Sequence, residues 1–241
     1  MNGKNTIATG FQQIGIQLGT QLDTVLGGGF HGGSLNVVAS RPGMGKNAFV
    51  LQCAAGMAKN TDKKICMFSR DISLDHIKKN FAGSCDQGNL MIDDSTPITL
   101  SQVRAKLAEI SDLGAVIIDF HLLQSDNGAC EQNAAASACK ISGELKRIAL
   151  ESEVPVLCNT RLPKKPYKGS RRPGPGELRV CGNLAEVADV ILFLHRDADL
   201  DVTEEMAGSQ ATEVIVAKNR YGELRTFLYP LPLPLPLPPL Q

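Results

Sequence analysis

The sequence has no excess of either charge and no apolar stretch long enough to suggest a membrane span. Its 241 residues include 25 Lys and Arg and 25 Asp and Glu, so no global positive field favours nucleic acid. Any such contact must therefore be local. The first ten residues, MNGKNTIATG, contain no apolar region, and we expect no secretory signal. With 241 residues, 43% of them hydrophobic, the chain is long enough for one large core or two small ones, and one domain is favoured.

The cysteines lack the CxxC spacing typical of metal-binding and redox motifs. There are seven of them, an odd number, and most lie inside apolar runs: Cys53, Cys66, Cys85, Cys130, Cys139, Cys158 and Cys181. This distribution predicts reduced, buried thiols. We therefore expect a protein of the cytoplasm, where thiols stay reduced.

Short β-branched runs alternate with helical stretches along the chain. Runs that are apolar on both faces and separated by helices predict a doubly wound α/β fold, with a mostly parallel sheet covered on both sides. The expected strands are Leu35–Ala39, Lys64–Phe68, Ala115–Asp119, Val154–Asn159, Val190–His195 and Glu213–Ala217. The expected helices are Lys46–Lys59, Ser73–Phe81, Thr99–Ile110 and Ala134–Glu151.

Local signals mark the start of one helix and the last turn of the sheet. The third helix opens with the capping signal TLSQ and places Leu100, Val103, Leu107 and Ile110 on one face. The Tyr221-Gly222 turn, followed by a strand over Leu224–Leu228, predicts a hairpin with Glu213–Ala217.

Two segments fall outside the alternating pattern. Residues 160–178 are rich in Pro, Gly, Lys and Arg and predict a long loop. Residues 230–241 alternate Pro and Leu, and we expect them to form an extended tail that does not continue the sheet. The tail is either an inert extension or a Pro-rich ligand for another protein, and the first is favoured. We therefore expect one domain over residues 1–229.

A strand, a small-residue loop and a helix follow one another between Leu35 and Lys59. This arrangement aims backbone N–H groups and the positive end of a helix at a phosphate, while Lys46 reaches the outer phosphates. The loop departs from GxxxxGK[ST], because Ser40 replaces the first Gly and Asn47 the Ser or Thr whose hydroxyl binds Mg²⁺. The expected nucleotide contacts are Ser40, Arg41, Pro42, Gly43, Met44, Gly45, Lys46, Asn47 and Ala48. A simple turn before a helix is the alternative.

The strand Gly114-Ala115-Val116-Ile117-Ile118 ends in Asp119. A carboxylate at the carboxyl end of a parallel strand lies at the ligand edge of the sheet, where it can hold Mg²⁺ through water. By itself an apolar strand ending in Asp is common. Together with the phosphate loop it predicts a site for a nucleoside triphosphate and Mg²⁺, with Asn47 and Asp119 as the metal-binding residues.

Seven stretches, taken in order from about Thr9 to Phe227, resemble the motor domain of DnaB-type replicative helicases. They are TGFQQIGIQLGTQLDTVLGGGFHGGSLNVVASRPGMGKNAF, FSRDIS, LMIDDSTPITLSQVRAKL, AVIIDF, VPVLCNTR, LRVCGNLAEVADVILFLHRD and VIVAKNRYG. The resemblance implies a RecA-like P-loop fold, ATP and Mg²⁺ as ligands, and a homo-hexameric ring that moves on single-stranded DNA. Other replisome proteins are further partners implied by it.

The resemblance also implies roles for individual residues. Asp71 occupies the position of the catalytic Glu that polarises the attacking water, and Arg161 that of a Gln that senses the γ-phosphate. Lys218 and Arg220 match a pair of cations that reach the neighbouring subunit's nucleotide. Two exposed hairpin cations are the alternative for that pair.

A basic loop follows the strand that ends near the γ-phosphate. It corresponds in the family to the channel loop that grips the backbone of single-stranded DNA, which needs cations but no base recognition. Solvated loop charge is the alternative. The expected DNA-binding residues are Lys164, Lys165, Lys168, Arg171 and Arg172.

Several departures separate this chain from the family that it resembles. Asp71 is one methylene shorter than Glu, Asn47 lacks a hydroxyl, and the stretch between Asp71 and Asp93 is short. We also expect no primase-facing domain before Thr9. A non-hydrolysing, nucleotide-binding partner of a helicase is therefore an alternative to a working motor. A recombinase of the RecA or RadA type is another, although the IDDSTPITLSQVRAKL and AKNRYG segments argue against it.

Overall fold

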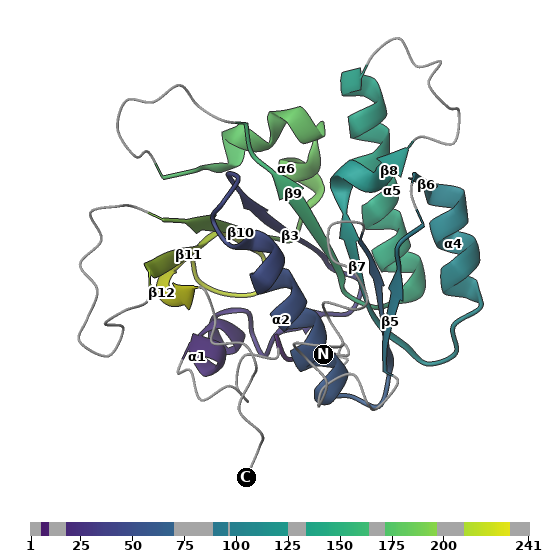
Figure 1. Cartoon of the computed structure of the whole chain (residues 1–241), viewed down its shortest axis with the longest axis horizontal. Helices are drawn as coiled ribbons and strands as arrows, with labels where there is room; N and C mark the ends of the chain where they lie inside the picture. Colours follow the sequence, from purple (N-terminus) through teal and green to yellow (C-terminus); the bar gives the residue numbers. More distant parts are fainter. Residues whose placement is uncertain are drawn as a thin grey trace.

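An eight-stranded sheet forms the centre of the protein in a computed structural model (Figure 1). The structure describes residues 6–9, 18–69, 89–95, 97–124, 134–163, 172–196 and 210–231. Its strand order is β12-β11-β10-β3-β9-β7-β4-β5. The strands are β3 (Leu35–Ser40), β4 (Lys64–Phe68), β5 (Leu90–Asp93), β7 (Leu113–Asp119), β9 (Val156–Arg161), β10 (Val190–His195), β11 (Gln210–Asn219) and β12 (Thr226–Leu231). Neighbours from β10 to β5 pair in parallel, whereas β11 and β12 add an antiparallel hairpin.

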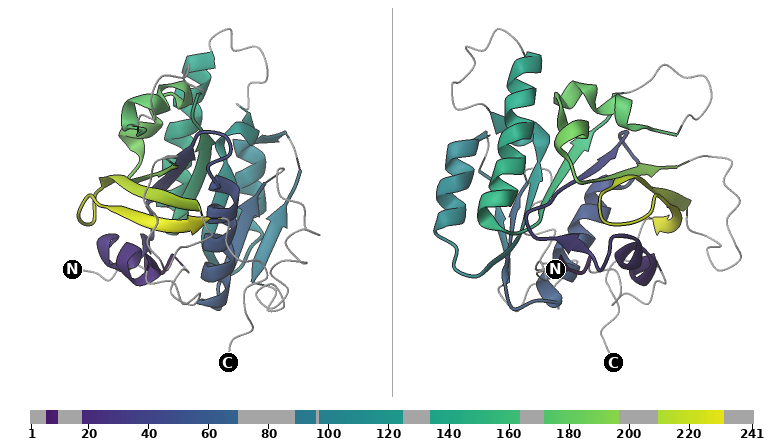
Figure 2. Two further views of the ribbon diagram at one scale, coloured as in Figure 1. Left: turned by 60° about the vertical axis from the view of Figure 1, so that its left-hand side comes forward. Right: turned by 180° about the vertical axis from the view of Figure 1, so that it is seen from behind.

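Helices cover both faces of this sheet. Figures 1 and 2 show α2 on one face and α4 and α5 on the other, as a doubly wound sheet requires. The helical segments are α1 (Leu18–Val25), α2 (Lys46–Lys59), α4 (Leu100–Ala108), α5 (Ala134–Ser152) and α6 (Leu184–Val187), with 3₁₀ turns η2 (Phe120–Leu122) and η4 (Pro175–Cys181). Two small pairs complete the fold: β1 (Thr6–Ile7) with β2 (Phe30–His31), and β6 (Ile98–Thr99) with β8 (Leu123–Gln124).

Strand residues alternate between two hydrophobic cores. Along β3, Val38 packs into the core under α2, whereas Val37 and Ala39 pack into the core under α5. In β7, Ile117 joins the first core and Ile118 the second. Because both faces are buried, the strands consist of almost continuous apolar runs instead of alternating polar and apolar residues.

The structure confirms the expected fold class. It places β4, β10 and α2 at the predicted residues, and it moves or lengthens the ends of β9, β11 and β12. The strand β5 was not predicted, because its four residues are only half-buried or exposed at the sheet's edge. The expected helix over Ser73–Phe81 lies outside the described residues.

Two expectations were wrong in detail. Pro230 and Leu231, assigned to the tail, belong to β12, where Pro230 pairs with Ala211. Proline is tolerated there because β12 is the edge strand.

Among the described cysteines, Cys139 is exposed, while Cys53, Cys66, Cys158 and Cys181 are buried free thiols. Burial raises the pKa of the Cys66 thiol to about 12, so it stays protonated. No helix in the described part of the chain is long and apolar enough to cross a membrane.

A reciprocal cap begins α4, as the TLSQ signal predicts. The Gln102 N–H donates to Thr99 Oγ1 over 3.3 Å, and the Thr99 N–H donates to Gln102 Oε1 over 2.9 Å. Leu100, Val103 and Leu107 then bury one face of the helix in the core that α5 shares. The cap therefore fixes where the helix begins, and the apolar stripe fixes which way it faces.

We expect Thr99→Ala to lower the free energy of unfolding by about 1 kcal/mol, because α4 then loses the acceptor for one of its first N–H groups. Urea denaturation of Thr99→Ala, Gln102→Ala and the double variant measures this. Since the two bonds form one cap, the double variant should lose less than the sum of the single losses. A Thr99→Ala protein as stable as the wild type would contradict this assignment.

Candidate functional site

The phosphate loop lies at the carboxyl end of β3, in the centre of the sheet. Gly43 and Gly45 adopt positive φ angles of 82° and 80°, a conformation that glycine accepts without strain. Gly45 is the N-cap of α2, so the first N–H groups of that helix face the loop. A cavity of about 320 Å³ lies over the loop, lined by Ser40, Arg41, Pro42, Gly43, Met44, Gly45, Lys46, Asn47, Ala48 and Arg161. The structure thus brings all nine predicted loop residues and Arg161 to one cavity.

Lys46 and Asp119 face each other across the base of this site. The side chains are only 6% and 7% exposed, and Lys46 Nζ lies 3.9 Å from Asp119 Oδ2. Lys46 Nζ also donates a 3.0 Å hydrogen bond to Asn47 Oδ1. The amide oxygen that replaces the usual hydroxyl therefore interacts with the lysine that is expected to bind phosphate.

Asp119 is held by one donor on each carboxylate oxygen. The His121 backbone N–H donates to Oδ1 over 3.0 Å, which caps the turn η2, and Asn159 Nδ2 donates to Oδ2 over 3.0 Å. Asn159 lies directly opposite Asp119 in the parallel pairing of β7 and β9. The neighbouring strand therefore fixes the orientation of the carboxylate.

His121 links this carboxylate to the end of β9. Its Nε2 accepts the Arg161 backbone N–H over 3.2 Å and lies 3.2 Å from Thr160 Oγ1. Burial, the largest cause, lowers the pKa of His121; Asp119 opposes the shift, and Arg161 and Lys46 add to it. A ring nitrogen that accepts an N–H is unprotonated, which agrees with a lowered pKa.

The residues at the site fit a magnesium ion carried by a nucleotide. Mg²⁺ keeps several waters and needs only one or two protein oxygens when phosphates supply the rest. Asp119 offers two oxygens that each accept one hydrogen bond, which leaves room for a bridging water. No group of three or more His, Cys, Asp or Glu side chains suited to a metal occurs among the described residues. The site therefore fits an ion whose remaining ligands are phosphate oxygens and water.

Arg161 and Arg41 form the cationic side of the cavity. Arg161 ends β9 directly opposite Ser40, and the next residue, Leu162, donates its N–H to the Ser40 carbonyl over 2.9 Å. Arg41 forms a 2.9 Å ion pair with Glu177 of η4. The strand that ends in Arg161 is thus attached to the first residue of the phosphate loop.

Lys218 and Arg220 lie at the opposite end of the sheet from their own phosphate loop. Lys218 pairs with Ile191 near the start of β10, and β10 begins beside the start of β3, whose other end carries the loop. Five strand rises of about 3.3 Å, or about 17 Å, separate the two ends of β3. These cations therefore cannot contact a nucleotide bound in their own chain.

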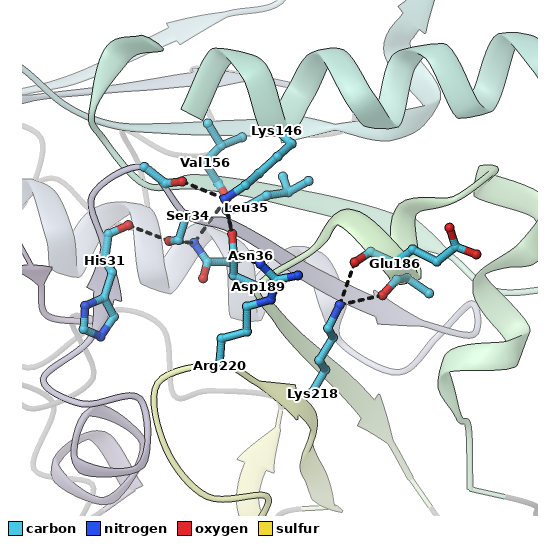
Figure 3. A network of polar contacts seen from close by, with 12 residues as sticks. His31, Ser34, Leu35, Asn36, Lys146, Val156, Glu186, Asp189, Lys218 and Arg220 are labelled. Carbon is cyan, nitrogen blue, oxygen red and sulfur yellow. Dashed lines mark hydrogen bonds and ion pairs between the residues drawn. The ribbon is translucent and has the colours of Figure 1, made fainter. Parts of the chain in front are cut away.

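Both cations have partners within the chain, as Figure 3 shows. Lys218 Nζ donates to the carbonyls of Ala185 and Glu186, at 3.0 and 2.8 Å. Burial, followed by the charge of Arg220, lowers the pKa of Lys218. Arg220 Nη1 lies 3.1 Å from Asp189 Oδ1, yet 55% of its side chain is exposed. Both side chains are thus held by partners in the same chain, and Arg220 is also exposed to solvent.

Asp189 is the centre of that polar network (Figure 3). Only 3% of its side chain is exposed, and its Oδ2 accepts the Leu35 N–H at 2.8 Å and Lys146 Nζ at 2.6 Å. Its Oδ1 accepts Arg220. One buried carboxylate therefore joins the start of β3, the helix α5 and the turn after β11.

Several predicted site residues lie outside the described part of the chain. They are Asp71, Lys164, Lys165, Lys168 and Arg171. Arg172 is described, and its guanidinium pairs with the buried Glu213 of β11, with Nε 2.8 Å from Oε2. In this structure Arg172 therefore fixes the end of the basic segment to the sheet.

Three polar residues were not singled out from the sequence: His121 and Asn159 at the site, and Asp189 at the opposite end of the sheet. Each had a signal that was too weak by itself, because polar residues next to apolar strands are common at sheet edges. His121 stands two residues after Asp119, Asn159 lies in the strand before Arg161, and Asp189 immediately precedes β10. Only their partners, which lie far away in the sequence, identify them.

A sequence profile of the family described as the DnaB-like helicase C terminal domain matches residues 15–81 and 73–229. The replicative DNA helicase DnaC of Bacillus subtilis is 31% identical over 88% of this chain and 53% of its own length. The replicative DNA helicase DnaB of Geobacillus stearothermophilus is 30% identical over the same shares. The chain thus spans about half the length of these curated relatives.

Solved structures share the fold. One of them, described as an ATPase domain, superposes with a TM-score of 0.76 and 24% identity, over 93% of this chain and 87% of that one. A DnaB-like replicative helicase, described together with its interactions with primase, gives a TM-score of 0.74 at 24% identity over 87% of this chain and 57% of the other. Both support the RecA-like α/β architecture predicted from the sequence.

We expect Asp189→Ala to lower the free energy of unfolding by about 3 kcal/mol, because Lys146 loses its carboxylate partner and the buried Leu35 N–H loses its acceptor. Arg220→Ala should cost less than about 1 kcal/mol, since that side chain is largely solvated. Urea denaturation of both variants measures the difference. Equal costs would mean that Asp189 does not organise this end of the sheet.

Proposed function

We propose, because the chain belongs to the DnaB-like helicase C-terminal domain family, that it is an ATP-dependent motor domain acting on single-stranded DNA in the cytoplasm, in a ring of identical subunits. The observation that carries this proposal is the cavity over the phosphate loop, where buried Lys46 faces buried Asp119. Membership of this family favours a helicase over a recombinase of the RecA type.

ATP would bind with its phosphates in the cradle between Gly43 and Lys46. The N–H groups at the start of α2 and the Lys46 ammonium would neutralise the phosphate oxygens. Asp119 and Asn47 would hold Mg²⁺, which would supply charge neutralisation at the phosphates when bound. The 3.0 Å contact between Lys46 and Asn47 keeps the amide oxygen beside the lysine ammonium.

Hydrolysis would need a base, an outer-phosphate contact and a further cation. Asp71 is the proposed base, and its side chain is one methylene shorter than the family's Glu. Arg161 is the proposed γ-phosphate contact, because it lines the same cavity as Lys46. We infer that hydrolysis is weak, since both the base and the metal ligand are altered.

The further cation would come from a neighbouring subunit. Lys218 and Arg220 lie at the opposite end of the sheet from their own phosphate loop, so they would complete another chain's site. Asp189 and the α6 carbonyls would hold them ready for that contact. Nucleotide would therefore lie between subunits of the proposed hexamer.

Single-stranded DNA would bind the basic segment that follows β9. Its start is attached to the phosphate loop through Leu162 and Ser40, and its end to β11 through Arg172 and Glu213. Lys164, Lys165, Lys168 and Arg171 lie between these two anchors in the sequence. Cations on such a segment neutralise phosphates without recognising sequence.

A nucleotide-binding partner of a helicase that does not hydrolyse ATP is the second candidate. The Lys46–Asn47 hydrogen bond favours it, because an amide oxygen that already accepts from lysine is a poorer metal ligand than a free hydroxyl. Both candidates bind ATP. They differ in turnover.

We expect the protein to bind a fluorescent ATP analogue, and Lys46→Ala to abolish the binding, because the lysine supplies a charge-assisted donor at the base of the cradle. Steady-state hydrolysis should lie well below the 1 to 100 per second that is roughly usual for phosphoryl-transfer enzymes. Lys59→Ala, at the far end of α2, is the matched control and should leave binding unchanged. Absence of binding in the wild type would contradict the proposed function. Turnover in the usual range would contradict only the impaired hydrolysis.

Replacing Lys164, Lys165, Lys168 and Arg171 by Gln should weaken single-stranded DNA binding equally for all sequences. Each lost phosphate contact should reduce the slope of log affinity against log salt by about 0.7. Fluorescence anisotropy over a salt series, with ATP analogue present, measures this. The control replaces Lys63, Lys140, Arg147 and Arg179 by Gln, which removes the same charge elsewhere. If both variants behave alike, the basic segment is not the DNA-binding surface.

A further inference from the structure

We propose that His121 is a positioning residue that holds Arg161 for recognition of the outermost phosphate, so that the site discriminates a nucleoside triphosphate from a diphosphate. The inference deepens the proposed function and rests on it. It starts from the His121 side chain, which links the carboxyl end of β7 to the backbone of Arg161.

His121 is itself fixed from two sides. It lies in the turn η2, which Asp119 caps by accepting the His121 N–H, so the backbone that carries the ring is tied to the carboxylate. The ring nitrogen Nε2 then lies 3.2 Å from both the Arg161 nitrogen and Thr160 Oγ1. A second bridge, from Asn159 to Asp119, runs parallel to it. The ends of β7 and β9 are therefore joined by two polar links.

The contact determines how Arg161 leaves the strand. Arg161 is the last residue of β9, where ladder hydrogen bonds to β7 have ended, because the pairing stops at Asp119 opposite Asn159. His121 supplies the acceptor that the next residues of β7 would otherwise have supplied. On the other side, Leu162 is bound to Ser40. The peptide before and the peptide after the Arg161 α-carbon are thus both held.

Arg161 has the chemistry to distinguish the two nucleotides. A guanidinium forms paired hydrogen bonds with a phosphate in one fixed orientation, so its benefit depends on how the side chain is placed. Its side chain lines the same cavity as Lys46 and the phosphate loop. A diphosphate lacks the terminal group that such a contact needs. A displaced Arg161 guanidinium should therefore reduce the affinity for the triphosphate and leave the affinity for the diphosphate unchanged.

The test compares the affinities of fluorescent, non-hydrolysable ATP and ADP analogues for the full chain and its variants. His121→Leu removes the acceptor, whereas His121→Gln keeps an acceptor at about the position of Nε2. We expect His121→Leu and Arg161→Ala each to lower the ATP-over-ADP preference roughly tenfold. His121→Gln should keep it, and His121→Leu combined with Arg161→Ala should be no worse than Arg161→Ala alone.

The outcomes separate the inference from the proposed function. Equal loss of both affinities in His121→Leu, or an unchanged preference, overturns the inference while nucleotide binding by the wild type upholds the proposed function. Absence of nucleotide binding in the wild type overturns both. Should His121→Leu fail to fold, as judged by circular dichroism, His121→Asn replaces it, because its amide is too short to reach Arg161. The ATP-over-ADP preference must then be lost in His121→Asn and kept in His121→Gln.

Discussion

The parallel pairing of β3, β9 and β7 is the constraint on which the rest of the structure depends. Parallel neighbours end at the same edge, so Ser40, Arg161 and Asp119 come together although they lie far apart in the sequence. The phosphate loop leaves from one of these strand ends and α2 begins directly behind it. Without this pairing the loop, the carboxylate and the cation would be three unrelated surface features.

The negative charge of a buried carboxylate is compensated at both ends of the sheet, but in different ways. Each carries a buried carboxylate, Asp119 at the carboxyl end and Asp189 at the amino end, and each carboxylate is compensated by N–H groups and a lysine. Compensation is necessary because an unpaired buried charge costs several kcal/mol. At the carboxyl end Lys46 remains 3.9 Å away and open to the cavity, whereas at the amino end Lys146 makes close contact at 2.6 Å. The looser pair at Asp119 is suited to binding a ligand, whereas the close ion pair at Asp189 is suited to holding the fold together.

In the proposed ring, this polarity would let one chain serve two nucleotide sites. The phosphate loop faces one end of the domain, and Lys218 and Arg220 face the other. The hairpin that carries these cations is tied to the start of β3 through Asp189. A rigid sheet would then connect the site that a subunit contains with the site that it would complete in its neighbour.

The sequence by itself determined most strands of the large sheet and its long helices, because their signals are local. The run of small residues before Lys46 predicts both the phosphate loop and the start of α2, and the TLSQ cap predicts the start of α4. Only the tertiary structure decided which side chains meet: His121 with Arg161, Asn159 with Asp119, and Arg172 with Glu213. These contacts depend on strand order and register, and a shift of one residue would turn every side chain of a strand to the other face. No local pattern encodes that register; the packing of both cores against the sheet sets it.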